Sequence, residues 1–119
     1  MLLIVGGEGS GKRSFAKALG YTDADVADGV LDAHPVICHV EQMVFADPER
    51  ADALLEPLCA KEVVICNEVG SGVIPADRAE RVGREATGRL CVRLAQQADC
   101  VVRMVSGLPT VIKGELPCR

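Results

Sequence analysis

A glycine-rich stretch directly behind a short apolar run limits most strongly how this chain can fold. Residues 1–5 read MLLIV, and residues 6–14 read GGEGSGKRS. This order predicts a strand, a tight turn and a helix, with backbone N–H groups gathered where the helix begins. The residues of this glycine loop are therefore candidates for binding phosphate: Gly6, Gly7, Glu8, Gly9, Ser10, Gly11, Lys12, Arg13 and Ser14.

The loop departs at one position from the phosphate-binding pattern G-x-x-x-x-G-K-[ST]. Lys12 supplies the cation expected to reach the outer phosphates of a nucleotide. Arg13 stands where a Ser or Thr hydroxyl ordinarily binds Mg²⁺, and Ser14 follows one position late, about 100° further around a helix. We therefore expect phosphate binding to persist, with Mg²⁺ held through water and other carboxylates or held poorly. Arg13 itself is expected to point to solvent or to another phosphate.

Apolar runs alternate with helical patterns along the rest of the chain, which predicts an α/β layer fold. We expect a P-loop NTPase-like three-layer fold with a small, mostly parallel sheet flanked by helices, because the core is aliphatic and aromatic residues are few. Residues 1–119 are read as a single nucleotide-binding domain, with residues 115–119 as a flexible tail. Strands are expected at 36–40, 62–66, 101–105 and 108–112, helices at 12–19, 48–59 and 76–98, and a loop with a short helix at 21–35.

Composition excludes several classes of function. The net charge of −4 and the near absence of stacking aromatics argue against nucleic-acid binding. No apolar run reaches 18 residues, so we expect no membrane span and a cytoplasmic protein. The six cysteines contain no C-x-x-C pair and are accompanied by only two histidines, which favours free, buried apolar thiols over a zinc site or disulfides.

Polar residues follow two of the expected strands. Glu41 ends the run at 36–40, and Asn67 and Glu68 follow the run at 62–66. Ligands of open α/β sheets gather at the carboxyl ends of strands, so these side chains are candidates for nucleotide contact, and the two carboxylates are candidates for holding Mg²⁺. The alternative is that both carboxylates cap helices or lie on the surface.

The second half of the chain carries the most specific resemblance. Residues 67–114 contain N-E-V-G-x-G-x-[IV]-P, G-R-L, A-x-x-A-D and V-S-G-L-P-x-x-[IL]-K in that order. With the V-G-G-x-x-S-G-K opening, these motifs resemble the bifunctional adenosylcobinamide kinase/adenosylcobinamide-phosphate guanylyltransferase family of cobalamin biosynthesis. The resemblance implies a kinase that moves a phosphoryl group from GTP or ATP to the hydroxyl of a cobinamide-type corrinoid. It also implies a nucleotidyltransferase that passes GMP through a covalent guanylyl-histidine, and a homo-oligomer.

The chain also departs from that family pattern. Members are longer on both sides of Glu41, and the first of these segments carries their nucleophilic histidine between arginines. Here residues 17–40 contain no Arg, and His34 is the candidate nucleophile, whereas His39 is read as a structural residue of a strand. Lys12, Glu41 and His34 are thus the expected catalytic residues. The alternatives are an impaired paralogue that binds nucleotide or corrinoid as a binding module, sensor or partner subunit, and a degenerate paralogue that binds neither.

Overall fold

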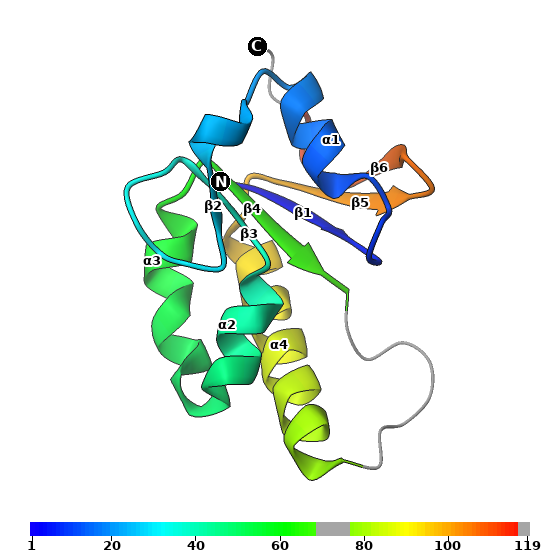
Figure 1. The fold of residues 1–119 in the computed structure, drawn as a ribbon. Coiled ribbons are helices and arrows are strands. Elements are labelled where there is room, and N and C mark those ends of the chain that lie inside the picture. The colour runs from blue at the N-terminus through cyan, green and yellow to red at the C-terminus, as the bar shows by residue number, and fades with distance from the viewer. Residues whose placement is uncertain (69–76, 117–119) are drawn as a thin grey trace.

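A six-stranded sheet forms the centre of the computed structural model, which describes residues 1–68 and 77–116 (Figure 1). The strands lie in the order β2-β3-β4-β1-β5-β6, and all neighbours are parallel except β5 and β6. The molecule therefore has the expected α/β class, with a mostly parallel sheet flanked by helices. The strands are β1 (Leu2–Gly6), β2 (Val26–Asp28), β3 (Val36–Cys38), β4 (Val63–Asn67), β5 (Cys100–Val105) and β6 (Leu108–Lys113).

The central strands form because their side chains are aliphatic on both faces. Leu3, Ile4 and Val64 are almost completely buried, which suits strands covered by helices above and below. Gly6 pairs with Asn67 across β1 and β4, so these two strands end at the same edge of the sheet. The parallel β2 and β3 end together as well. Residues that follow these strands are consequently brought close together.

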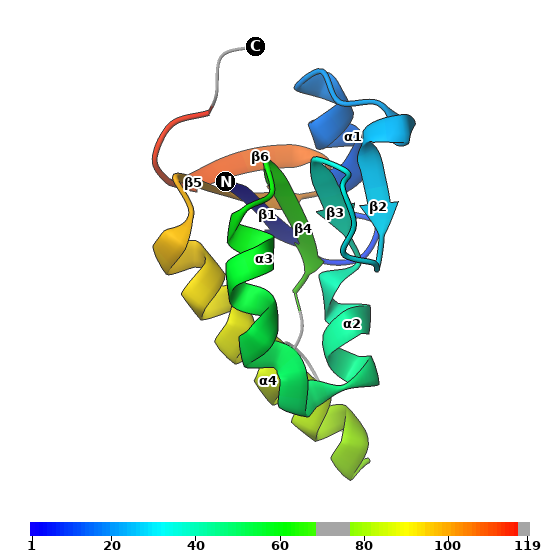
Figure 2. The same ribbon diagram turned by 90° about the vertical axis from the view of Figure 1, so that its left-hand side faces the viewer.

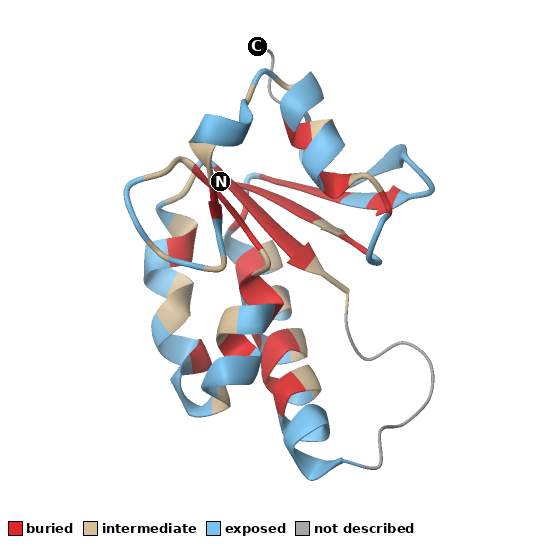
Figure 3. Cartoon of the chain, in the orientation of Figure 1, coloured by how far each residue is buried: buried red, intermediate tan, exposed pale blue. Residues whose placement is uncertain are grey.

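Helices cover both faces of the sheet, and two apolar cores result. Helix α1 (Lys12–Ala18) lies on one face, whereas α2 (Val40–Ala46), α3 (Leu55–Cys59) and α4 (Arg78–Gln97) lie on the other (Figures 1 and 2). Buried residues concentrate on the central strands and on the inner sides of α2 and α4, while β6 is exposed along its length (Figure 3). Asp77 caps α4, because its carboxylate accepts the Ala79 N–H at 2.8 Å.

Three sequence expectations are corrected by the observed elements. The strand expected to reach residue 40 ends at Cys38, because His39 adopts a left-handed backbone conformation and caps the unexpected helix α2. The helix expected at 48–59 is a 3-10 helix, η2 (Pro48–Leu54), followed by the short α3. The segment at 21–35 contains the 3-10 helix η1 (Asp23–Asp25) and also the edge strand β2.

The other expected elements are confirmed, with ends shifted by at most two residues. The long helix is α4, and the last expected strand is β6, which pairs antiparallel with β5. Among the described residues, none of the helices has both the length and the apolar character needed to cross a membrane. Most of the expected tail at 115–119 lies outside the described residues.

Candidate functional site

The glycine loop connects the end of β1 to the start of α1, as the sequence predicts. Gly9 and Gly11 have φ angles of 73° and 93°, which side-chain-bearing residues rarely adopt. A Cβ atom at Gly6 would lie 2.7 Å from the Met104 carbonyl oxygen, so the strand end also requires glycine. The Gly107 N–H donates to the Ser10 carbonyl at 2.9 Å and ties the loop to the β5–β6 turn. The conformation of the loop is thus fixed by close backbone approaches.

Lys12 folds back over this loop. Its side chain is only 7% exposed, and Nζ donates a hydrogen bond to the Gly7 carbonyl oxygen at 2.6 Å. Burial lowers the pKa of Lys12 below its ordinary value, although the negative charge of Glu41 partly opposes this. The Ser10 hydroxyl is also buried, and its Oγ has no hydrogen-bond partner in the described part of the chain. The Lys12 ammonium group keeps further donors that a bound anion could accept.

A pocket of about 320 Å³ opens beside the loop. It is bounded by the glycine loop and α1 on one side and by the ends of β3 and β4 on the other. Its walls therefore come from the strand ends that the parallel sheet brings together. The lining residues are Glu8, Gly9, Gly11, Lys12, Arg13, Ser14, Cys38, His39, Ile65 and Asn67.

Glu41 reaches the site from the first turn of α2 and not from a strand end. It is 7% exposed, and its Oε1 accepts the Asn67 backbone N–H at 3.0 Å. This hydrogen bond links α2 to the end of β4. The negative charge of Glu41 opposes the lowering of the Lys12 pKa, although Glu41 itself is not among the residues that line the pocket. The structure thus brings Lys12, Glu41 and Asn67 together.

Glu68 and Arg13 make ion pairs directed elsewhere. Both carboxylate oxygens of Glu68 accept from the guanidinium of Arg103, at 2.7 and 3.1 Å, and raise the pKa of that arginine. Glu68 lines a separate groove with residues of α4. The Arg13 guanidinium lies 3.6 Å from the carboxylate of Asp23 in η1, on the exposed side of α1. Arg13 therefore lines the pocket and also forms an ion pair with η1 next to it.

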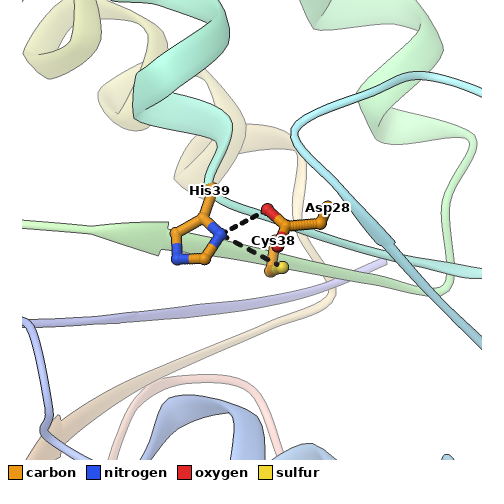
Figure 4. A group of neighbouring side chains, drawn as sticks. All are labelled: Asp28, Cys38 and His39. Atoms are coloured by element: carbon orange, nitrogen blue, oxygen red, sulfur yellow. Dashed lines mark hydrogen bonds and ion pairs between the residues drawn. The ribbon is translucent and has the colours of Figure 1, made fainter. Parts of the chain in front are cut away.

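The two histidines occupy different positions. His34 lies in the connection between β2 and β3, and its Nδ1 is 2.6 Å from the carboxylate of Asp32; it does not line the pocket. His39 does line the pocket, although the sequence reading placed it inside a strand. Its Nδ1 lies 2.5 Å from Asp28 Oδ1 and 3.6 Å from Cys38 Sγ (Figure 4).

The sequence analysis did not predict that Asp28, Cys38 and His39 lie together. A cysteine–histidine pair directly after a buried strand was the available signal, but the acidic partner could not be placed because β2 was not recognised. The hydrogen bond from His39 lowers the pKa of Asp28, whereas burial raises the pKa of the Cys38 thiol.

Comparison with known proteins gives one family and several relatives. The family described as cobinamide kinase / cobinamide phosphate guanyltransferase (CobU) matches residues 29–112. The match contains Cys38, Glu41, Asn67 and helix α4, and it begins after the glycine loop.

Three bifunctional adenosylcobalamin biosynthesis proteins are similar to the chain. CobU of Salmonella typhimurium LT2 is 46% identical over 81 residues, which covers 61% of this chain and 45% of that protein. CobU of Escherichia coli K12 is 36% identical over 74 residues, covering 62% and 41%. CobP of Pseudomonas aeruginosa PAO1 is 36% identical over 76 residues, covering 58% and 44%. The chain thus spans less than half the length of these relatives.

Proposed function

Because the chain belongs to the cobinamide kinase / cobinamide phosphate guanyltransferase family, we propose that it binds GTP or ATP and phosphorylates a cobinamide-type corrinoid. The terminal phosphoryl group would pass from the nucleotide to the corrinoid hydroxyl. The observation that carries this proposal is the buried ammonium group of Lys12 above a glycine loop. Because the family match begins at residue 29, the loop is a separate argument for nucleotide binding.

The residues of the loop fit a polyphosphate. Lys12 has one hydrogen-bond acceptor in the described structure, the Gly7 carbonyl, and can turn its remaining donors to phosphate oxygens. The Ser10 hydroxyl in the same loop is also unpaired in the described structure, but Ser10 is not among the residues that line the pocket. Phosphoryl transfer depends mainly on positioning and on neutralising charge, and Lys12 would provide both for the transferred group.

The residues fit Mg²⁺ less well. Arg13 stands in place of the usual hydroxyl, and Arg103 engages the carboxylate of Glu68. Glu41 remains as an oxygen donor beneath the pocket, where a water molecule could link it to a cation. We propose that Mg²⁺, when bound, is held mainly by phosphate oxygens and water and has no direct protein ligand.

Guanylyl transfer is a second candidate activity, and the position of a histidine favours it. In this step an imidazole nitrogen attacks the α-phosphorus of GTP, a P–N bond forms and pyrophosphate leaves. His34 was the candidate from the sequence, but His39 lines the pocket beside the glycine loop. We propose Nε2 of His39, the ring nitrogen on the side away from Asp28 and Cys38 (Figure 4), as the better-placed acceptor of GMP and keep His34 as the alternative.

Two measurements test these proposals. The first is transfer of labelled γ-phosphate from GTP and from ATP to cobinamide, with Lys12→Met as the inactive control. Binding of nucleotide without transfer would instead support the binding-module alternative, and no binding at millimolar nucleotide would support the degenerate paralogue. The second is mass spectrometry after incubation with GTP, in which a GMP adduct on His39, on His34 or on neither distinguishes the three possibilities.

A further inference from the structure

Three side chains that commonly bind metals converge at the ends of β2 and β3. Asp28 is the last residue of β2 and pairs in register with Cys38, the last residue of β3; His39 follows directly. One potential ligand atom from each lies within 4.8 Å of the other two. Figure 4 shows Nδ1 of His39 directed toward both the Asp28 carboxylate and the Cys38 sulfur.

We propose that Asp28, Cys38 and His39 bind a thiophilic divalent cation such as Zn²⁺. Imidazole, thiolate and carboxylate are the ligands that Zn²⁺ takes in proteins, whereas a thiolate is a poor ligand for Mg²⁺ or Ca²⁺. The cation would replace the thiol proton of Cys38, which passes to solvent. This site is distinct from the glycine loop and does not depend on nucleotide binding.

The distances suit a tetrahedral ion with a small adjustment. Zn–N and Zn–S bonds of about 2.0 and 2.3 Å place nitrogen and sulfur about 3.5 Å apart at tetrahedral angles. His39 Nδ1 and Cys38 Sγ are 3.6 Å apart. The Asp28 oxygen lies 2.5 Å from Nδ1 and would move to about 3.3 Å. This movement is feasible because the Asp28 side chain is 58% exposed.

The backbone holds the other two ligands in place. Cys38 is buried at the end of β3, which fixes its sulfur. His39 has φ 56° and ψ 40°, a left-handed conformation that costs a residue with a side chain about 1–2 kcal/mol. An unfavourable conformation of this kind at a pocket wall is a reason to look for a function of the residue. Here it places the imidazole next to both partners.

Three protein ligands leave one tetrahedral position for another molecule. Cys38 and His39 both line the pocket beside the glycine loop, so this fourth ligand would come from that pocket. Water or an anionic oxygen suits the position, as in zinc sites that keep an open coordination position. The proposed site is therefore accessible to small molecules and is not a closed structural centre.

Cobalt(II) is a suitable probe because a thiolate ligand gives it an intense near-ultraviolet charge-transfer band. The full chain, kept reduced, should show this band together with the visible bands of four-coordinate cobalt, and Zn²⁺ should displace both. Cys38→Ser should abolish the charge-transfer band. Asp28→Asn and His39→Ala should weaken binding at least as much as the roughly 10–100-fold that outer-sphere partners contribute. Thermal melts followed by circular dichroism would establish that each variant folds.

Two matched controls lie elsewhere in the chain. His34 pairs with Asp32 at 2.6 Å in a similar exposed arrangement, but no cysteine is recorded with them in the described structure, so His34→Ala should leave cobalt binding unchanged. Cys59→Ser removes a half-buried thiol on α3 and should also have no effect. No thiolate–cobalt band in the wild-type protein, or a band retained in Cys38→Ser, would overturn the proposal. Because the assay uses metal alone, its failure is separable from failure of nucleotide binding.

Discussion

Replacing Lys12 with methionine should change nucleotide affinity and stability in opposite directions. Methionine keeps the apolar stem and removes the ammonium group. In the nucleotide-free protein, Lys12 is buried and its pKa is lowered, so the fold disfavours its charge on balance despite the hydrogen bond to Gly7. We expect the variant to be more stable to unfolding, by about 0.5–2 kcal/mol, the usual gain when a destabilising site residue is replaced.

The loss of affinity follows from the same geometry. A second Nζ donor, beside the one that reaches the Gly7 carbonyl at 2.6 Å, would bond a phosphate oxygen. A hydrogen bond involving a charged group contributes about 1.5–3 kcal/mol. At about 1.4 kcal/mol for each tenfold change, Lys12→Met should weaken GTP binding by about 10- to 150-fold.

Urea denaturation and titration calorimetry would measure the two quantities on the same preparations. Lys17 provides the control, since it lies five residues further along α1, is exposed and pairs with Asp23 at 3.0 Å. Lys17→Met should change both quantities by no more than about 0.5 kcal/mol. A Lys12→Met protein that loses stability and keeps its affinity would refute the reasoning, because Lys12 would then be only a structural residue.

Three further expectations concern other parts of the molecule. Arg13→Ser should strengthen the Mg²⁺ dependence of nucleotide binding. If calorimetry shows the same dependence as in the wild type, the missing hydroxyl at position 13 does not account for weak Mg²⁺ binding. Gly83→Ala should destabilise the protein by about 1–3 kcal/mol, because the new Cβ would lie 2.2 Å from the Phe45 ring. Gly88 lies on the same helix in open space, so Gly88→Ala should stabilise the protein by up to about 1 kcal/mol. Urea denaturation that shifts the free energy of unfolding in the same direction for both variants would contradict this expectation. The hydrogen bond with His39 lowers the pKa of Asp28 below its ordinary value of 3.8, so ionised Asp28 stabilises the fold above that pH, and this stabilisation is lost as the pH falls through the lowered pKa. In Asp28→Asn, the free energy of unfolding should therefore depend less steeply on pH below about pH 4. An unchanged pH dependence would exclude this contribution.

The parts of the fold that the sequence predicts are those in which local pattern and tertiary environment agree. The run before the glycine loop is short, apolar throughout and mostly buried, so its length and the glycines that follow it identify β1. The long helix α4 carries its own cap at Asp77 and a regular apolar face. Both elements could be placed within one or two residues because no distant contact opposes the local preference.

The elements that the sequence predicts wrongly are those whose secondary structure is determined by tertiary contacts. The strand β2 has three residues and no distinctive pattern, and it exists because β3 offers a parallel partner. The continuation of β3 through residue 40 was a reasonable reading of an apolar run. It fails because His39 turns the chain into α2, whose buried face packs against α4. A left-handed histidine has no reliable signature in a single sequence.

The candidate site likewise has a part that the sequence predicts and a part that only the structure reveals. The glycine loop and Lys12 are encoded by consecutive residues, so their arrangement follows from spacing alone. Glu41 was expected near the site and lies near it, but on a helix and bonded to the Asn67 backbone. The Asp28–Cys38–His39 cluster joins residues from two strands, and only the pairing of those strands reveals it.

The charges around the pocket connect the glycine loop with the Asp28–Cys38–His39 cluster. The pocket wall has positive charge at Lys12 and Arg13 but negative charge at Glu8, and Arg13 is partly neutralised by its ion pair with Asp23. Glu41 adds a buried carboxylate beneath the same wall. A triphosphate is strongly anionic, so the carboxylates of Glu8 and Glu41 oppose part of the attraction that Lys12 provides. A divalent cation that replaces the Cys38 thiol proton would raise the charge of the cluster by one, which offsets the charge of Asp28, and by linkage each ligand would then strengthen binding of the other by the same factor. The proposed metal site would therefore neutralise an acidic strand end beside the glycine loop, while Lys12 and Arg13 at the first turn of α1 would remain the cations that face a bound nucleotide.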